Sequence, residues 1–246
     1  MNLIVDIGNT RVKLAVVDMA GAVVCQAASG QFDGAMRSTV ESWRVEYGLN
    51  RSIVSSTRGD QSSVVAFLQR VIGHCLLFDG LTAVPIGNRY STPETLGRDR
   101  LAAAVGARYL WPDAECLIVD FGTAITIDLV SVEGGFEGGV ISPGVSMRYA
   151  ALHDYTASLP LCEACEVNDG ISRTTREAIE QGVMRGICYE IEGYVVAAEA
   201  KYQKIVVIFT GGDAKYFDKR IKNAIFAMCD LVVVGLNEIL KYNEEN

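Results

Sequence analysis

The feature that most constrains this chain is a repeat of its opening segment. Residues 3–18, LIVDIGNTRVKLAVVD, align without a gap on residues 117–132, LIVDFGTAITIDLVSV, so that Asp6 matches Asp120 and Gly8 matches Gly122. Any two apolar strands look alike, but a shared Leu-Ile-Val-Asp-x-Gly is hard to obtain by chance. The repeat predicts an internal duplication, with two halves of the same architecture packed around a cleft of the kind that binds ligands.

Each half opens with three short apolar segments that polar turns separate, which predicts an antiparallel meander. In the first half we expect strands at 2–7, 12–17 and 22–26, helix 34–47, strand 52–56, helix 61–72, strand 75–79, a loop over 83–98 and helix 99–110. In the second we expect strands at 116–120, 124–130 and 135–141, helix 174–201, strand 204–210, a helix near 216–228, strand 231–234 and a short final helix. The pattern predicts an α/β fold of two βββαβα halves, 1–114 and 115–246.

Composition narrows the partners of the chain. With 246 residues, half of them apolar, the chain can bury a large core, and its net charge of -8 offers no positive field to attract nucleic acid or an anionic membrane. No apolar run approaches the ~18 residues that cross a bilayer, and the opening residues do not form a signal peptide. The seven scattered cysteines do not resemble a disulfide framework. We therefore expect a cytoplasmic protein that binds neither nucleic acid nor membrane.

The two repeated D-x-G turns are candidate phosphate sites. A glycine turn between antiparallel strands presents backbone N–H groups, and the missing Cβ lets a phosphate approach the chain. Asn9, Thr10 and Lys13 add donors and one positive charge, while Asp6 can hold a cation or its water shell. Either turn alone is equally an ordinary hairpin, but their recurrence favours a nucleotide that both halves bind.

Two further segments have candidate roles. Gly211-Gly212-Asp213 follows an apolar strand, where bare backbone can accept an adenine or a ribose, although a simple turn has the same signature. Gly97-Arg98-Asp99-Arg100 enters a predicted helix, so Asp99 is either a helix cap or a carboxylate that accepts a hydroxyl proton. The two flanking guanidinium groups favour its ionised form and can hold an anionic substrate.

The motifs D-x-G-N-T-x-x-K, G-x-D-R, D-x-G-T and G-G-D, in this order, resemble those of the type III pantothenate kinases. These enzymes belong to the superfamily of sugar and acetate kinases, actin and the heat-shock ATPases, and the resemblance covers nearly the whole chain. It implies two actin-like (ribonuclease H-like) halves around a nucleotide-binding cleft. It also implies phosphorylation of pantothenate by ATP with Mg²⁺, the first step toward coenzyme A.

The resemblance gives each matching residue an expected role. Asp99 would be the catalytic base, and Asp120 the metal ligand for a potassium or ammonium ion. ATP would be bound by Asp6, Ile7, Gly8, Asn9, Thr10, Arg11, Val12, Lys13, Thr123, Gly211, Gly212 and Asp213. Pantothenate would be bound by Tyr90, Gly97, Arg98, Asp99, Arg100 and Thr175.

The resemblance also implies a homodimer with shared active sites, in which Thr175 reaches the pantothenate of the neighbouring subunit and residues 139–144 form part of the interface. Arg98 departs from the family, which usually has a small residue at this position. A side chain that points into the acceptor pocket would narrow it.

Two alternatives remain on the sequence alone. The phosphate turns identify the donor better than the acceptor, so another small-alcohol kinase of the same superfamily is the first. A non-enzymatic nucleotide-binding regulator is the second, although such a protein has no need of a base at Asp99. The acidic balance argues against direct contact with DNA.

Overall fold

The computed structural model describes residues 1–217, 220–221, 224–226 and 231–245. Contacts between residues divide the chain into two compact units. The first unit comprises Met1–Pro112, Glu133–Phe136 and Cys229–Asn246, and the second comprises Asp113–Val132 and Glu137–Met228. These units reflect packing, whereas the predicted halves 1–114 and 115–246 describe the duplication and stay a prediction.

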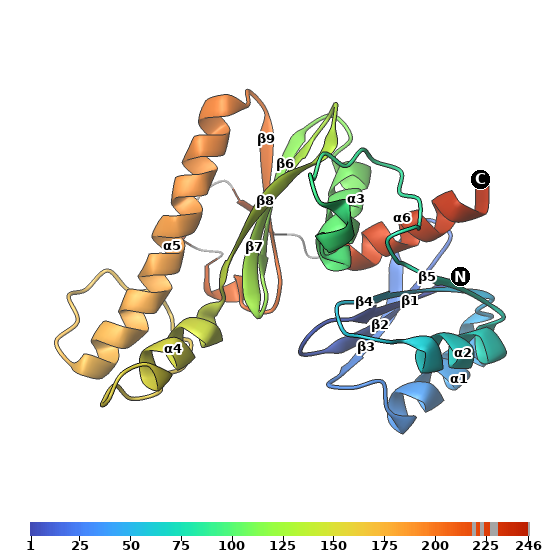
Figure 1. Cartoon of the computed structure of the whole chain (residues 1–246), viewed down its shortest axis with the longest axis horizontal. Coiled ribbons are helices and arrows are strands. Elements are labelled where there is room, and N and C mark those ends of the chain that lie inside the picture. The colour runs from blue at the N-terminus through green and yellow to red at the C-terminus, as the bar shows by residue number, and fades with distance from the viewer. Residues whose placement is uncertain (218–219, 222–223, 227–230, 246) are drawn as a thin grey trace. The chain divides into compact units, whose positions relative to one another are not determined.

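The first unit is built on a five-stranded mixed sheet (Figure 1). Its elements are β1 (Asn2–Ile7), β2 (Val12–Val17), β3 (Val23–Ser29), α1 (Gly34–Tyr47), β4 (Arg51–Ser56), α2 (Ser62–Ile72), β5 (His74–Leu77), η1 (Pro93–Thr95), α3 (Arg98–Leu110) and α6 (Leu231–Glu245). The strand order is β3-β2-β1-β4-β5, with β1 antiparallel to β2 and parallel to β4. Because β1 and β4 are parallel, their carboxyl ends meet at the same edge of the sheet.

Helices cover both faces of this sheet. Alternate residues of β1 pack with α1 and α2 in one apolar core that includes Leu3, Val5 and Phe67. On the other face, α6 contacts β1 and β4, and the buried Asn2 donates its side-chain N–H to Asn237 Oδ1 over 2.9 Å.

Helices α3 and α6 pack backbone against backbone. A Cβ atom on Gly235 of α6 would collide with the carbonyl oxygen of Ala102, and one on Gly106 of α3 would collide with that of Leu231. The alanines and Gly106 of α3 are therefore a docking face for α6, and a larger residue at Gly106 or Gly235 would separate the two helices.

The second unit repeats this architecture. Its elements are β6 (Glu115–Phe121), β7 (Ala124–Ser131), β8 (Gly135–Pro143), α4 (Val145–Asp154), α5 (Thr175–Lys201), β9 (Ile205–Thr210), η2 (Ala214–Tyr216) and β10 (Ala224–Phe226), with Gly135 and Phe136 of β8 in the first unit. The order β8-β7-β6-β9-β10 matches β3-β2-β1-β4-β5, with β6 antiparallel to β7 and parallel to β9. The predicted α/β class with two like halves is confirmed, and the structure adds that both sheets have the same strand order.

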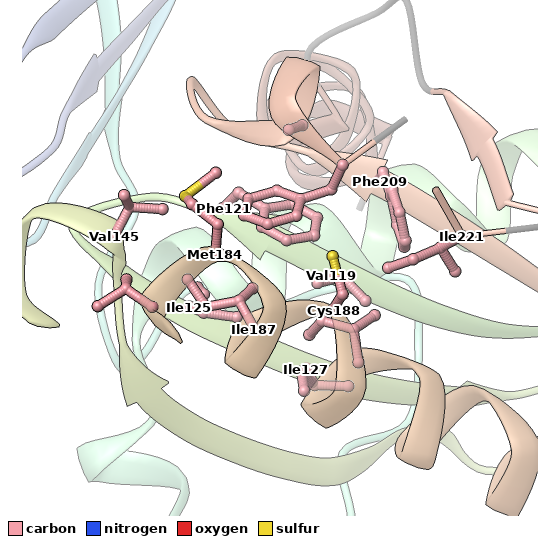
Figure 2. Packing of buried hydrophobic residues seen from close by; sticks show 14 of the residues in the cluster. Val119, Phe121, Ile125, Ile127, Val145, Met184, Ile187, Cys188, Phe209 and Ile221 are labelled. Atoms are coloured by element: carbon pink, nitrogen blue, oxygen red, sulfur yellow. The ribbon is translucent and has the colours of Figure 1, made fainter. Parts of the chain in front are cut away.

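The core of the second unit lies between its sheet and α5 (Figure 2). Phe121, at the end of β6, is its centre: the ring of Phe209 meets it edge to face with centroids 5.0 Å apart, and Phe217 stacks on it at 4.8 Å. Met184 and Ile187 of α5 belong to the same core.

Neither α5 nor any other helix in the described part of the chain is long and apolar enough to cross a membrane.

Three elements differ from the sequence-based expectation. The strand predicted at 231–234 is wrong, because Leu231–Val234 form the buried first turn of α6, and a short apolar run has the same pattern in a buried helix. The helix predicted near 216–228 is wrong at Ala224–Phe226, which pair in parallel with β9 as β10. Residues 218–219, 222–223 and 227–228 of that prediction lie outside the described residues. Helix α4 was not predicted.

Candidate functional site

The first predicted phosphate turn lies where β1 ends. Asp6 is buried there and pairs in register with Lys13 of β2 and Ser55 of β4. The N–H of Gly8 donates to the carbonyl of Arg11 over 2.9 Å and closes the turn. The residues between them are exposed. The segment predicted to bind ATP is thus one hairpin, with a buried carboxylate at its base and exposed residues at its tip.

The backbone of this turn does not require glycine at position 8. Gly8 is not among the glycines with positive φ, and a Cβ atom on it would have Arg11 O as its nearest neighbour at 3.4 Å, at the edge of ordinary van der Waals contact. The fold has room for alanine here. The close approach of a phosphate to Gly8 stays a prediction.

Residues that follow β4 hold the first turn from the side, and sequence reasoning missed them. The N–H of Thr57 donates to the carbonyl of Ile7 over 3.0 Å, and the guanidinium of Arg58 donates to the carbonyl of Asn9 over 2.9 Å. Arg58 also bonds the carbonyl of Gly30, beyond β3. These residues could have been found from the strand pairing: β4 is parallel to β1, so the residues that follow β4 lie at the same edge of the sheet as the turn after β1.

The second phosphate turn lies where β6 ends and is held by glycines. Gly211 has φ 93°, and a Cβ on it would collide with Asp120 Oδ1 and lie 2.6 Å from the backbone N of Phe121. The N–H of Asp213 donates to the carbonyl of Phe121 over 3.1 Å. The structure therefore brings Asp120 together with the segment predicted to bind adenosine.

A second glycine, Gly144, supports this turn from the start of α4. The N–H of Gly144 donates to the carbonyl of Thr123 over 3.2 Å, and a Cβ on Gly144 would lie 2.6 Å from the carbonyl oxygen of Gly122. Thr123 itself is exposed. The segment 139–144, predicted at the dimer interface, thus ends beneath a predicted nucleotide contact.

The predicted base lies in the first turn of α3. Oδ1 of Asp99 accepts the backbone N–H of Arg100 over 2.9 Å. A Cβ on Gly97 would stand 2.6 Å from the same oxygen, so glycine at this position makes room for the carboxylate. The Gly97 carbonyl accepts the N–H of Leu101 over 3.2 Å, which begins the helix without a side-chain cap. Asp99 is therefore not the residue that caps α3.

Two of the predicted pantothenate contacts form an aromatic cluster beside this helix. Arg100 is a buried residue, 7% exposed, and its guanidinium lies 5.8 Å from the ring centroid of Tyr90 and 5.6 Å from that of Phe136. The two rings meet edge to face with centroids 5.8 Å apart. Phe136 was missed, because it lies at the start of β8, far from Tyr90 in the sequence, and no sequence pattern connects the two residues.

Arg98 extends toward the turn after β5. Its guanidinium lies 6.0 Å from the ring centroid of Phe78, and its Nη2 would be 3.2 Å from a Cβ on Gly80. The backbone N–H of Leu81 is the main cause that lowers the pKa of Asp79, and the charge of Arg98 contributes less. A contact of Arg98 with pantothenate stays a prediction.

Thr175 is the exposed first residue of α5 in the second unit. Thr174 caps this helix by accepting the N–H of Glu177 over 3.2 Å. The buried Gln181 ties the preceding loop to the helix, since its Nε2 donates to the carbonyl of Glu166 over 3.0 Å. The cap and the contact of Gln181 thus hold the start of α5, where Thr175 lies. The contact of Thr175 with pantothenate stays a prediction.

The predicted cation ligands are single carboxylates. Within the described ranges, the chain has no group of three or more His, Cys, Asp or Glu residues that could hold a metal ion. A site built wholly from protein carboxylates is therefore absent from this part of the chain. The carboxylates of Asp6 and Asp120 each suit an ion that takes its other ligands from phosphates, backbone carbonyls or water.

The chain is similar to known proteins over its whole length. The family model described as type III pantothenate kinase matches residues 2–197. A type III pantothenate kinase from Bacteroides fragilis is 41% identical over 99% of this chain and 98% of its own length, and one from Phocaeicola vulgatus is 38% identical over 100% of both.

Two solved structures share the fold. One, described as a conserved putative Baf family transcriptional activator from Campylobacter jejuni, has a TM-score of 0.64 at 21% identity and covers 99% of this chain and 100% of that one. The other, a putative 2-dehydro-3-deoxygalactonokinase from Sinorhizobium meliloti, has a TM-score of 0.61 at 14% identity and covers 99% of both chains. These likenesses show the fold alone, whereas the family model and the relatives cover the chain at higher identity: the chain belongs to the type III pantothenate kinase family.

Proposed function

We propose that this chain phosphorylates pantothenate to 4′-phosphopantothenate with ATP, the first step of coenzyme A biosynthesis. The observation that carries the proposal is the similarity to type III pantothenate kinases over the full chain. The duplicated geometry supports it, because each sheet carries a carboxylate and a turn at the same end of its central strand. Such turns offer the N–H donors and the carboxylates that phosphates and their cations need.

In this proposal the nucleotide is bound by residues of the two repeated turns and of the segment 211–213. The first turn holds phosphates through its backbone and through Asn9, Thr10 and Lys13, and the segment 211–213 receives the adenosine. Mg²⁺ keeps several waters and binds phosphates with one or two carboxylates, so Asp6 is a fitting ligand. When bound, the ion neutralises charge between phosphate oxygens.

The acceptor site is assigned to the start of α3. Asp99 Oδ1 already accepts the N–H of Arg100, so Oδ2 is the oxygen that we assign to take the hydroxyl proton of pantothenate. Tyr90, Arg98 and Arg100 hold the acceptor beside it. Phosphoryl transfer asks for position and charge stabilisation more than covalent chemistry, and a carboxylate fixed at one oxygen supplies such a position.

We also propose a cytoplasmic homodimer that uses a monovalent cation. Asp120 would hold potassium or ammonium beside the second turn. Exposed apolar side chains support the interface; they lie on β8, α4 and α5 and comprise Val140, Ile141, Met147, Tyr189, Tyr194 and Val196. Arg148 connects these elements, since it bonds Ser142 and pairs with Glu190.

The function is tested by an acceptor screen with ATP and Mg²⁺ that measures ADP release. We expect release that depends on pantothenate and slows strongly when sodium replaces potassium. Equal rates in the two salts would remove the cation at Asp120. If a different small alcohol is phosphorylated and pantothenate is not, the protein is a kinase for that alcohol and the proposed function is wrong.

The shared site is tested by mixing two inactive variants, Asp99→Asn and Thr175→Arg. Random pairing makes about half of the dimers mixed, and each mixed dimer holds one site without either lesion. About a quarter of wild-type activity should therefore return after the two are unfolded and refolded together. Activity at the parental mean, in a sample shown to contain mixed dimers, would place both residues in the site of one subunit.

A further inference from the structure

Arg58 lies outside every motif of the family resemblance, yet it is bonded to the first phosphate turn. We propose that Arg58 is a positioning residue for the phosphates of the bound nucleotide and acts through the backbone of the turn. The inference rests on the proposed function, because it takes residues 6–13 as the phosphate segment. It requires no contact between Arg58 and the nucleotide.

The guanidinium joins the ends of three strands. Its Nη2 donates to the carbonyl of Asn9 over 2.9 Å, in the turn between β1 and β2, and to that of Gly30 over 3.2 Å, just beyond β3. Its Nη1 donates to the same Gly30 carbonyl over 3.3 Å. Arg58 itself lies just beyond β4, and Ser56 fixes its backbone: Ser56 Oγ lies 3.0 Å from both the N and the O of Arg58.

The bond to Asn9 sets the direction of a donor. A trans peptide group is planar, and its C=O and N–H point in opposite directions. A carbonyl of Asn9 that points to Arg58 therefore turns the N–H of Thr10 to the opposite side of the turn. Rotation of this peptide would break the bond to the guanidinium, so Arg58 restricts the direction in which the turn presents the Thr10 N–H.

The chemistry of this contact favours arginine. A guanidinium is a planar fork that can reach two carbonyls in fixed directions, whereas an ammonium is a point charge on a flexible stem. Arg58 is half-buried, so water can reach the two carbonyls if the side chain is shortened. Loss of the fork should then loosen the turn without unfolding the unit.

The test compares three full-length variants: Arg58→Met, Arg58→Lys and the matched control Arg70→Met. Arg70 lies in the same unit on α2, with its guanidinium 5.5 Å from the centroid of the Phe67 ring. Arg70→Met removes one positive charge, as Arg58→Met does. Affinity for ADP is measured by calorimetry, KM for ATP and pantothenate by ADP release, and folding by thermal unfolding.

We expect Arg58→Met to weaken ADP binding and raise KM for ATP about tenfold, the effect of one charge-assisted hydrogen bond, with KM for pantothenate within twofold of the control. Arg58→Lys should lie between this variant and the wild type. ADP affinity equal to that of Arg70→Met, or equal increases in both KM values, would overturn the inference. If Arg58→Met does not fold, wild-type ADP affinity in Arg58→Lys would overturn it in the same way.

The two proposals fail separately. A wild-type protein that binds ADP and does not phosphorylate pantothenate would contradict the proposed function, and the ADP affinities would still decide the role of Arg58. A wild-type protein without affinity for ADP would overturn both.

Discussion

The two predicted phosphate turns lie in the two copies of one repeated sequence, but the protein supports them by different means. The first turn is held from outside by side-chain and backbone donors of Thr57 and Arg58. The second is enclosed by backbone, with Gly144 on one side and Gly211 on the other. The difference teaches that a duplicated motif keeps its carboxylate and its strand pairing, while each copy can find its own means of support.

The difference also predicts how the two turns respond to change. Side-chain donors can be exchanged for water at modest cost because Arg58 is half-buried. Backbone contacts leave no space for an added carbon atom. Substitutions at the second turn should therefore damage the fold and binding together, and those at the first should affect binding alone.

The largest effect is expected where neither turn changes. Asp99→Asn keeps the shape of the side chain and removes the base, so turnover should fall about 10²–10⁴-fold while ADP affinity stays within twofold. Steady-state kinetics and calorimetry measure the two quantities. Glu94→Gln, an exposed change in η1, is the control and should keep wild-type turnover. Loss of ADP binding in Asp99→Asn would mean that Asp99 contributes to the ATP site, and would contradict the proposal that it acts on pantothenate alone.

Gly211→Ala should give the next largest effect. Alanine at φ 93° is strained by about 1–2 kcal/mol, and its Cβ would also collide with Asp120 Oδ1. We expect ADP to bind about a hundredfold more weakly, as a displaced carboxylate and backbone strain together would cost, with a lower melting temperature. Gly182→Ala on α5 of the same unit is the control, because Gly182 lies outside the predicted ATP segments and a Cβ on it meets nothing within 4 Å. Equal behaviour of the two variants would show that the enclosure of the second turn does not matter.

The smallest effect is expected at the first turn. Gly8→Ala fits the backbone, so the melting temperature should stay within about 1 °C of wild type, since less than about 0.3 kcal/mol is lost. If a phosphate approaches this glycine, KM for ATP should rise about tenfold, as for one lost hydrogen bond. A melting temperature as low as that of Gly211→Ala would contradict the comparison, and an unchanged KM would remove Gly8 from the phosphate site.

Sequence reasoning reached the fold through the repeat. The alignment of residues 3–18 on 117–132 predicted two halves of the same architecture, and both sheets have the antiparallel hairpin that this predicts, β1–β2 in one and β6–β7 in the other. It failed at Leu231–Val234, where four apolar residues in a row look the same in a strand and in a buried helix. Only the contact with Ala102 and its neighbours, far away in the sequence, distinguishes the two.

Candidate site residues could be predicted from the sequence where they stand in a short motif. Residues that only tertiary contacts bring to these motifs could not. Asp6, Asp99 and Asp120 stand in short patterns that a sequence displays. Arg58 follows the parallel strand β4 and Phe136 lies at the start of β8, so their contacts with predicted site residues follow only from the folded chain. Arg98 shows the same limit, since its direction toward Phe78 is set by the turn after β5.

The contact between α3 and α6 has a consequence for synthesis on the ribosome. More than a hundred residues separate Pro112 from Leu231, so at ~5–20 residues per second the segment through α3 is complete roughly ten seconds before α6 is made. During that interval the face of α3 around Ala102 and Gly106 lacks the helix that covers it, and so do the residues of β1 that α6 contacts. The unit that carries Asp99 is therefore closed by its most recently made helix, and nascent chains that stop before Leu231 expose an apolar surface for a chaperone to bind.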